Sequence, residues 1–283
     1  MKYRLLALDV DGTLVGPDNV MPPDVAEAVS AADRAGLGVC GATGRSYGET
    51  EPIWRRLGLE PPHQPMILIG GALVSEPDTG RSLYHKPIPH ETAVQFADAL
   101  GQAGYCAMAI VDAWRHAVEY FLTETGEVDE IERRWFSRMD VKVRRVRRLA
   151  DAGGPEAPDV LRISTVVEAD RGPRLAESLR RRFDGALGVH SILAPNYGVT
   201  IVEAHAAGAD KSTALRYVAQ ATRTPPGRVV AVGDDINDIA MLRGAGLGVA
   251  MPGAPESVLA AADHVAAGGL ARFVRGLIDG RFD

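Results

Sequence analysis

The sequence predicts an α/β protein in which a parallel sheet forms one domain and an inserted α/β segment forms another. Short apolar runs alternate with amphipathic stretches from residue 4 to residue 69, and this alternation resumes near residue 198. Between the two parts, the order of strand-like and helix-like segments is irregular. Because alternating buried strands and helices fold into parallel sheets covered on both faces, we expect the outer parts to share one sheet.

The first outer part contains three expected strands. Residues 4–8 form an apolar run that ends beside Asp9, and similar runs follow at 37–42 and 66–69. Amphipathic stretches at 22–35 and 47–57 predict the intervening helices. A hairpin is expected at 72–85, because its centre reads Glu-Pro-Asp-Thr-Gly between two strand-like runs.

Residues 86–194 are expected to form the inserted α/β domain, and residues 1–85 and 195–283 the outer one. The inserted part has helix-like segments at 90–103 and 170–183 and strand-like segments at 105–111, 141–146 and 160–167. The second outer part has expected strands and helices at 198–203, 211–222, 228–232, 236–243 and 247–250.

The inserted domain also has an uneven charge distribution. Residues 124–132 are acidic, whereas residues 133–148 are rich in arginine and contain a single acid, Asp140. A solvated surface explains such a run in most proteins. Alternatively, some of these arginines hold a second anionic group of a substrate.

Composition favours a small-molecule partner. A net charge of −6 over 283 residues lacks the basic excess that nucleic-acid and membrane binders usually carry. The two cysteines, Cys40 and Cys106, lie far apart and in no metal-binding pattern, which fits a reducing cytoplasm. We expect no secretory leader, because the N-terminus lacks a long apolar region, and no membrane-spanning segment, because no apolar run is long enough; we leave the oligomeric state open.

The first chemical motif directly follows the first strand. It reads Asp-Val-Asp-Gly-Thr-Leu and places two carboxylates, Asp9 and Asp11, at the mouth of the predicted sheet, where α/β folds bind ligands. Gly12 lets the backbone approach a phosphate closely. Asp and Gly are also ordinary turn residues, but the complete motif in this position favours chemistry.

The second motif, Thr43-Gly44-Arg45, ends the second strand. A hydroxyl and backbone amides at a strand-to-helix junction can cradle phosphate oxygens. Capping of the next helix by Thr43 or Ser46 is an equally simple explanation.

The third motif is Lys211, which follows a possible helix cap at Asp210. A lysine at a helix N-terminus is unfavourable for the helix dipole, which suggests that an anion lies nearby. An exposed surface lysine is the alternative.

The fourth motif reads Gly-Asp-Asp-Ile-Asn-Asp and contains Asp234, Asn237 and Asp238. Crowded carboxylates repel one another unless a cation neutralises them. Oxygen ligands at a phosphate site point to Mg²⁺, although a turn of this kind can also lack a function.

These four motifs, in this order, resemble the haloacid dehalogenase (HAD) superfamily, specifically its Cof-type sugar phosphatases, over nearly the whole chain. The resemblance implies a Rossmann-like parallel-sheet core, an inserted α/β cap, and a magnesium-dependent phosphatase that acts on a small organic phosphate. It implies that Asp9 is the nucleophile and that Asp11 protonates the leaving oxygen and then activates water.

The resemblance also implies the remaining site residues. Thr43 and Lys211 would bind the transferring phosphoryl group. Phosphate contacts would come from Gly12, Thr43, Gly44, Arg45 and Lys211, and Asn237 would contact phosphate or Lys211. The Mg²⁺ site would consist of Asp9, the Asp11 carbonyl and Asp234, with Asp238 supporting it. One departure is Gly70-Gly71-Ala72, where these phosphatases usually carry Asn-Gly-Ala, so a side chain that could contact substrate or phosphate is missing.

Two other functions remain open at this point. A phosphotransferase or phosphomutase of the same superfamily would use the same groups but pass the phosphoryl group to a sugar hydroxyl. A non-catalytic signalling module phosphorylated on one aspartate would explain the acids, Thr43 and Lys211, but not Asp11 or the inserted domain.

Overall fold

The computed structural model describes residues 1–124, 141–153, 157–194 and 198–283. The chain divides into two compact units. Unit 1 consists of Met1–Tyr84 and Asp210–Asp283, and unit 2 consists of His85–Ala209.

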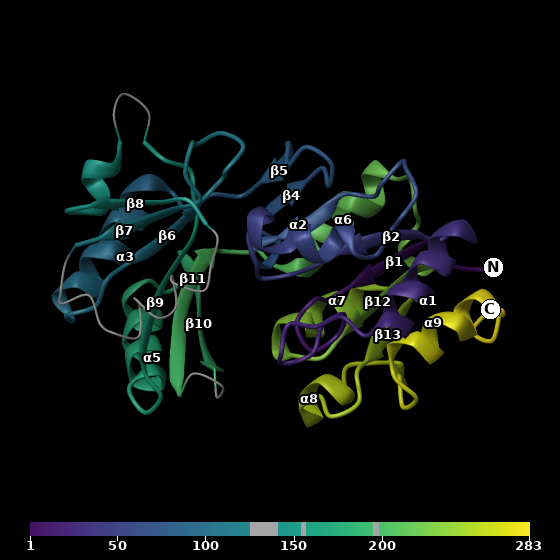
Figure 1. Cartoon of the computed structure of the whole chain (residues 1–283). Coiled ribbons are helices and arrows are strands. Elements are labelled where there is room, and N and C mark those ends of the chain that lie inside the picture. Colours follow the sequence, from purple (N-terminus) through teal and green to yellow (C-terminus); the bar gives the residue numbers. More distant parts are fainter. Residues whose placement is uncertain (125–140, 154–156, 195–197) are drawn as a thin grey trace. The chain divides into compact units, whose positions relative to one another are not determined.

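Unit 1 is built on a five-stranded parallel sheet in the order β14-β13-β12-β1-β2 (Figure 1). The strands are β1 Leu5–Leu8, β2 Gly38–Gly41, β12 Val229–Gly233, β13 Leu247–Ala250 and β14 His264–Val265. Its helices are α1 Pro23–Arg34, α2 Tyr47–Arg55, α6 Lys211–Ala221, α7 Ile239–Gly244, α8 Glu256–Leu259 and α9 Leu270–Ile278. This arrangement confirms the predicted α/β class with a parallel sheet.

Strand β1 is apolar and buried at every position, which indicates that both faces of this sheet are covered. Leu5 and Ala7 of β1 belong to a buried cluster that includes Leu215 of α6 and Leu242 of α7. Strand side chains alternate between faces, so Leu6 and Leu8 point to the opposite side. Helices α1 and α9 pack against each other in unit 1, and α1 also contacts β2.

A separate three-stranded sheet in the order β3-β4-β5 follows α2. Its strands are β3 Met66–Leu68, β4 Leu73–Ser75 and β5 Ser82–His85. The backbone amide of Gly80, at φ 71°, donates to the carbonyl oxygen of Glu76 at 2.9 Å, which closes the predicted hairpin turn.

The described residues of unit 2 form a six-stranded sheet in the order β10-β11-β9-β6-β7-β8 and include two α-helices. The strands are β6 Met108–Val111, β7 Tyr120–Thr123, β8 Val143–Val146, β9 Val160–Glu168, β10 Leu187–Ala194 and β11 Val199–Ala206; the helices are α3 His90–Gln102 and α5 Gly172–Arg182. Phe96 and Leu100 of α3 and Leu179 of α5 pack with Ile163 and Val202 from the sheet.

The structure changes one expected assignment. The segment 198–203 was expected in the outer domain, but β11 pairs antiparallel with both β9 and β10 in unit 2. The contact boundary therefore falls at Ala209 and Asp210, later than the expected boundary at 194. Apolar alternation identifies a strand, whereas the sheet that it joins depends on partners distant in sequence.

The arginine-rich segment is only partly described, since residues 125–140, including Arg133, Arg134 and Arg138, lie outside the described residues. Two of the described arginines have partners within unit 2. Arg148 forms an ion pair with Asp98 at 2.5 Å, and the Arg144 guanidinium lies 5.8 Å from the Phe121 ring centre.

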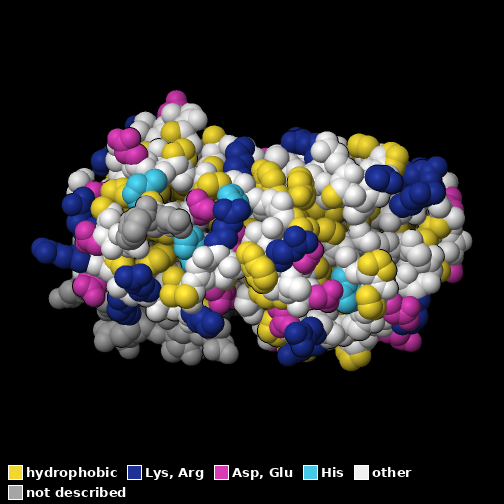
Figure 2. All heavy atoms as spheres, turned by 90° about the horizontal axis from the view of Figure 1, so that it is seen from above, with side chains coloured by type: hydrophobic (Ala, Val, Ile, Leu, Met, Phe, Trp, Pro, Cys, Tyr) yellow, Lys and Arg dark blue, Asp and Glu magenta, His cyan; other side chains and the backbone are white. Residues whose placement is uncertain are grey.

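Acidic and basic side chains are interspersed over the described surface that Figure 2 presents, without a broad basic patch. Among the described residues, no helix has both the length and the apolar character needed to cross a membrane.

Candidate active site

Three parallel strands of unit 1 end at the same edge of the sheet. Leu8, the last residue of β1, pairs with Gly41 of β2 and with Val232 of β12. The polar residues that follow these strands therefore lie at one edge, as the motifs predicted: Asp9, Thr43 and Asp234. Ligands of open parallel sheets bind at this edge.

Lys211 lies at the centre of this site and its side chain is only 1% exposed. Its Nζ donates to Oδ1 of Asp9 at 2.5 Å and to Oδ1 of Asp238 at 2.7 Å, and Oδ1 of Asn237 is 3.5 Å away. Burial lowers the pKa of Lys211, but the two aspartates outweigh burial and raise this pKa above its ordinary value. Lys211 is thus a buried ammonium and not a surface lysine.

The start of α6 fixes the position of Lys211. Oδ1 of Asp210 accepts a hydrogen bond from the backbone amide of Thr213 at 2.7 Å, which is the predicted helix cap. Gly71 has φ 99°, and a Cβ at this residue would lie 2.1 Å from the carbonyl oxygen of Asp210. Gly71 therefore packs its backbone against the residue before Lys211, a role that the sequence did not indicate.

Three carboxylates surround the Lys211 ammonium. One oxygen each of Asp9, Asp234 and Asp238 can be chosen so that all three lie within 4.8 Å of one another. Burial and then Asp238 raise the pKa of Asp234 to about 6, and burial also raises the pKa of Asp9, which Lys211 opposes. Three acids and one ammonium leave an excess of negative charge, and an oxygen-only donor set of this kind fits Mg²⁺.

Asp238 is committed to protein groups. Its Oδ2 accepts hydrogen bonds from the backbone amides of Asp234 at 3.0 Å and Asp235 at 3.1 Å, while its Oδ1 binds Lys211. Asp238 is fully buried. It therefore holds the turn after β12 in place and orients both Asp234 and Lys211.

Gly12 and Thr13 contact Asp234 from the first motif. Gly12 has φ 79°, and a Cβ there would lie 2.0 Å from Oδ2 of Asp234, so only glycine fits without a shift. The Thr13 hydroxyl donates to Oδ1 of Asp234 at 3.3 Å. Thr13 was not predicted as a site residue, and only its place within the first motif could have indicated it.

Asp11 lies apart from the three-carboxylate cluster. Its side chain is 58% exposed and pairs with Arg45, whose Nε donates to Asp11 Oδ2 at 3.0 Å. A second bond joins Arg45 Nη2 to Asp11 Oδ1. The backbone carbonyl of Asp11 remains a predicted metal ligand, while its carboxylate binds the Arg45 guanidinium.

The turn after β2 places Thr43 and Arg45. Thr43 is fully buried, and its hydroxyl oxygen accepts a hydrogen bond from the backbone amide of Arg45 at 3.1 Å. Ser46, not Thr43, caps α2: Ser46 Oγ accepts from Glu49 N at 3.4 Å, and Glu49 Oε2 accepts from Ser46 N at 2.9 Å. The Thr43 hydroxyl retains the capacity to donate to a phosphate oxygen.

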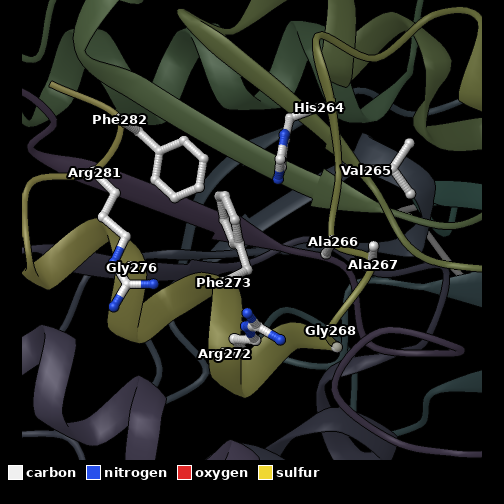
Figure 3. A pocket seen from close by; sticks show the side chains of 11 residues that line it. His264, Val265, Ala266, Ala267, Gly268, Arg272, Phe273, Gly276, Arg281 and Phe282 are labelled. Atoms are coloured by element: carbon white, nitrogen blue, oxygen red, sulfur yellow. The ribbon is translucent and has the colours of Figure 1, made fainter.

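A different hollow of unit 1, with a volume of about 320 Å³, lies beside α9 and is lined by residues before, within and after this helix (Figure 3). Phe273 stacks on His264 with ring centres 5.8 Å apart and contacts Phe282 at 5.0 Å. This hollow contains none of the predicted site residues, so the carboxylate cluster remains the candidate active site.

Comparisons with a family model, with known sequences and with solved structures agree on one family. A model of haloacid dehalogenase-like hydrolases matches residues 6–268. Phosphatase YwpJ of Bacillus subtilis is 26% identical over 93% of this chain and 94% of its own length. The pyridoxal phosphate phosphatase YbhA of Escherichia coli is 27% identical over 94% and 93%, respectively.

Two further similarities extend over nearly the whole chain. The 5-amino-6-(5-phospho-D-ribitylamino)uracil phosphatase YitU of Bacillus subtilis is 24% identical over 97% of both chains. A haloacid dehalogenase-like hydrolase from Bacteroides thetaiotaomicron superposes with a TM-score of 0.79 at 22% identity, covering 97% of this chain and 99% of that one. At 22% identity, the similarity to the Bacteroides structure shows a shared fold and nothing more.

Proposed function

The chain belongs to the Cof-type group of the haloacid dehalogenase superfamily and is a phosphoric monoester hydrolase, and we propose that it works through a phosphoaspartate at Asp9. The observation that carries this proposal is the buried contact of Lys211 with Asp9 at the edge of a parallel sheet. A cation beside the nucleophile lowers the repulsion between a carboxylate and a phosphate dianion.

In the first step, a carboxylate oxygen of Asp9 attacks phosphorus and the bond to the leaving oxygen breaks. Asp11 gives that oxygen a proton. In the second step, water attacks the phosphorus, the bond to Asp9 breaks, and Asp11 takes up the proton of water while inorganic phosphate leaves. Lys211 and the Thr43 hydroxyl would neutralise and orient the phosphoryl oxygens, with Gly12, Gly44 and Asn237 as further contacts.

We propose that Asp9, Asp234 and the Asp11 carbonyl hold Mg²⁺. The oxygen donors and the excess negative charge of the cluster support this choice. When bound, the ion would neutralise charge on the phosphoryl group. Asp238 would act through its bonds to the backbone amides of Asp234 and Asp235.

The substrate class that we propose is a small phosphorylated metabolite. Two relatives are named as phosphatases of pyridoxal phosphate and of a ribitylaminouracil phosphate, two unrelated small esters. We propose that unit 2 serves as the cap that selects among such esters. A cytoplasmic location is part of the proposal, since Cys40 and Cys106 are buried and not joined in a disulfide.

The experiment is a panel of phosphate esters assayed with Mg²⁺, comparing the wild type with Asp9→Asn. Sugar phosphates, pyridoxal phosphate, nucleotides and p-nitrophenyl phosphate would be included, with and without an excess of sugar acceptor. We expect inorganic phosphate as the product and a loss of several orders of magnitude in Asp9→Asn. Activity that survives this substitution would exclude the covalent route, and phosphate transfer to the sugar would indicate a phosphotransferase.

A further inference from the structure

Arg45 donates two hydrogen bonds to the carboxylate of Asp11. Arg45 Nε donates to Oδ2 at 3.0 Å, and Nη2 donates to Oδ1. Two parallel bonds between a guanidinium and a carboxylate fix the orientation of both groups, which a single bond does not. The sequence predicted a phosphate contact for Arg45, and the structure directs its guanidinium to Asp11.

The backbone of Arg45 is held on both sides. Its amide donates to the Thr43 hydroxyl oxygen at 3.1 Å, and its carbonyl oxygen accepts from the Ile69 amide at 2.9 Å. The capping box of α2 begins at the next residue, Ser46. The Arg45 side chain is 21% exposed, so the guanidinium extends from a fixed turn and not from a mobile surface segment.

Asn19 provides a third oxygen for the same guanidinium. Its Oδ1 accepts from Arg45 Nη2 at 2.8 Å. Asn19 has φ 62°, a left-handed conformation that asparagine tolerates. Its backbone amide donates to the Gly16 carbonyl oxygen at 2.9 Å and closes a turn. Arg45 is therefore bound by oxygens from two positions in the loop that follows β1.

Asp11 depends on these contacts for its position. Its side chain is 58% exposed. An exposed carboxylate usually samples several rotamers, whereas proton transfer requires a fixed distance to the reacting oxygen. A guanidinium has only donors, so it pairs with the oxygens of an acceptor carboxylate.

We propose that Arg45 and Asn19 form a clamp that positions the Asp11 carboxylate to accept the proton of the attacking water. This inference rests on the proposed function. In that step the water oxygen bonds to phosphorus, the bond between phosphorus and Asp9 breaks with its electron pair returning to the Asp9 carboxylate, and the proton of water passes to Asp11. Arg45 is a positioning residue in this step, because it acts through Asp11.

The test uses p-nitrophenyl phosphate in rapid-quench kinetics with Mg²⁺. Nitrophenolate is a good leaving group that needs little protonation, so formation of the phosphoaspartate depends only weakly on Asp11, whereas its breakdown still requires a base. We expect Arg45→Ala to release about one nitrophenolate per protein in a burst and then turn over roughly a hundredfold more slowly than wild type. Intact-protein mass spectrometry should show the phosphate adduct accumulating.

Matched variants separate positioning from other effects. Arg45→Lys keeps the charge without the fork and should fall between wild type and Arg45→Ala. Asn19→Gly keeps the left-handed backbone but removes the side-chain oxygen, and should change in the same direction by a smaller factor. Arg55→Ala, at a guanidinium 76% exposed, is the control for loss of an arginine.

Two results would overturn the clamp. One is an equal loss in burst rate and steady-state rate in Arg45→Ala without accumulation of the adduct, which indicates general damage. The other is a rise in KM with kcat unchanged, which indicates a phosphate contact. Failure of the proposed function looks different, since wild-type protein would then never carry phosphate on Asp9.

Discussion

At the scale of single residues, Lys211 shows how a site can be built around a buried charge. An ammonium with 1% exposure would be unfavourable alone, but Asp9 and Asp238 lie at 2.5 and 2.7 Å from its Nζ. Asp234 adds further negative charge to the same cluster. The lysine therefore stabilises the folded site and also prepares it for an anion.

Lys211→Met tests both effects, because methionine keeps the unbranched shape and removes the charge. We expect turnover to fall at least roughly a hundredfold, since a preorganised electrostatic contact is lost. Without metal, the free energy of unfolding should fall by about 3 kcal/mol, because buried carboxylates lose their partner. Urea denaturation with EDTA measures this change, and Mg²⁺ should reverse part of it. Lys142→Met, at an exposed position, is the control; equal stability of both variants would contradict the prediction.

His205 of β11 makes a different prediction, which concerns pH. Burial lowers the pKa of His205 to about 4, Glu203 opposes this shift, and Arg162 and His190 add to it. The ordinary value is 6.5, so between about pH 4 and 6.5 the unfolded chain binds more protons at this residue than the folded one. The contribution of His205 to the stability of unit 2 is therefore fully present above pH 6.5. It is lost as the pH falls toward 4, and the free energy of unfolding decreases by about 3 kcal/mol at most.

Hydrogen exchange of the β9 and β11 amides, compared between wild type and His205→Phe at each pH, measures this effect. The variant should lose less protection than wild type on acidification, because it has no imidazole to protonate. Identical losses in the two proteins would show that His205 does not control the acid sensitivity of unit 2.

The sequence identified most residues that the structure gathers at the site, but not their pairing. Asp9, Lys211, Asp234, Asn237 and Asp238 were each named from a motif, and they lie together at one sheet edge. The pairing of Arg45 with Asp11 and Asn19 depends on how two loops approach each other. No local pattern contains that information, so it could not be predicted.

At the scale of elements, the central strands of unit 1 were easy to predict and the sheet of unit 2 was not. The expected strand at 4–8 corresponds to β1 at Leu5–Leu8, because an apolar run buried on both faces has one simple interpretation. By contrast, β10 is only partly buried along its length and was not predicted. Its neighbour β11 was predicted as a strand but placed in the other domain.

The loop after β1 carries a steric prediction. Gly12→Ala would place a Cβ 2.0 Å from Oδ2 of Asp234. We expect this variant to fold but to bind Mg²⁺ at least roughly tenfold more weakly, because Asp234 must move and a small misplacement disrupts the coordination geometry. Isothermal titration calorimetry with Mg²⁺ measures the affinity.

Gly36→Ala is the matched control for this substitution. Gly36 has φ 89°, so alanine is strained there too, but no described atom other than those of Gly36 and its two chain neighbours lies within 4 Å of the added Cβ. If both alanine variants bound Mg²⁺ equally well, the contact between Gly12 and Asp234 would not matter for the metal.

At the scale of the whole molecule, the candidate metal site lies entirely in unit 1. Asp9 follows β1 and Asp234 follows β12, and both strands belong to the unit 1 sheet. A ligand that binds the folded state stabilises it by about 2.7 kcal/mol at a concentration a hundredfold above Kd. This stabilisation should be confined to the unit that contains the site.

We therefore expect Mg²⁺ to slow hydrogen exchange in β1 and β12 and to leave β9 and β11 of unit 2 unchanged. EDTA should abolish turnover without unfolding either unit, because the sheet is formed by apolar packing and not by the metal. Exchange mass spectrometry with and without Mg²⁺ provides the measurement. Equal protection of both units, or unfolding in EDTA, would be inconsistent with a preformed site in unit 1.

The division of unit 1 into two chain segments also has a consequence for biosynthesis. Strand β1 lies between β2 and β12, and β12 belongs to the segment that begins at Asp210. On the ribosome, the apolar strand Leu5–Leu8 therefore lacks one of its two neighbouring strands until Val229–Gly233 has been synthesised. Unit 2, a continuous segment, can complete its own sheet during that interval. Strand β1 therefore depends on protection from aggregation during that interval, and the segment that begins at Asp210 completes both the sheet and the site.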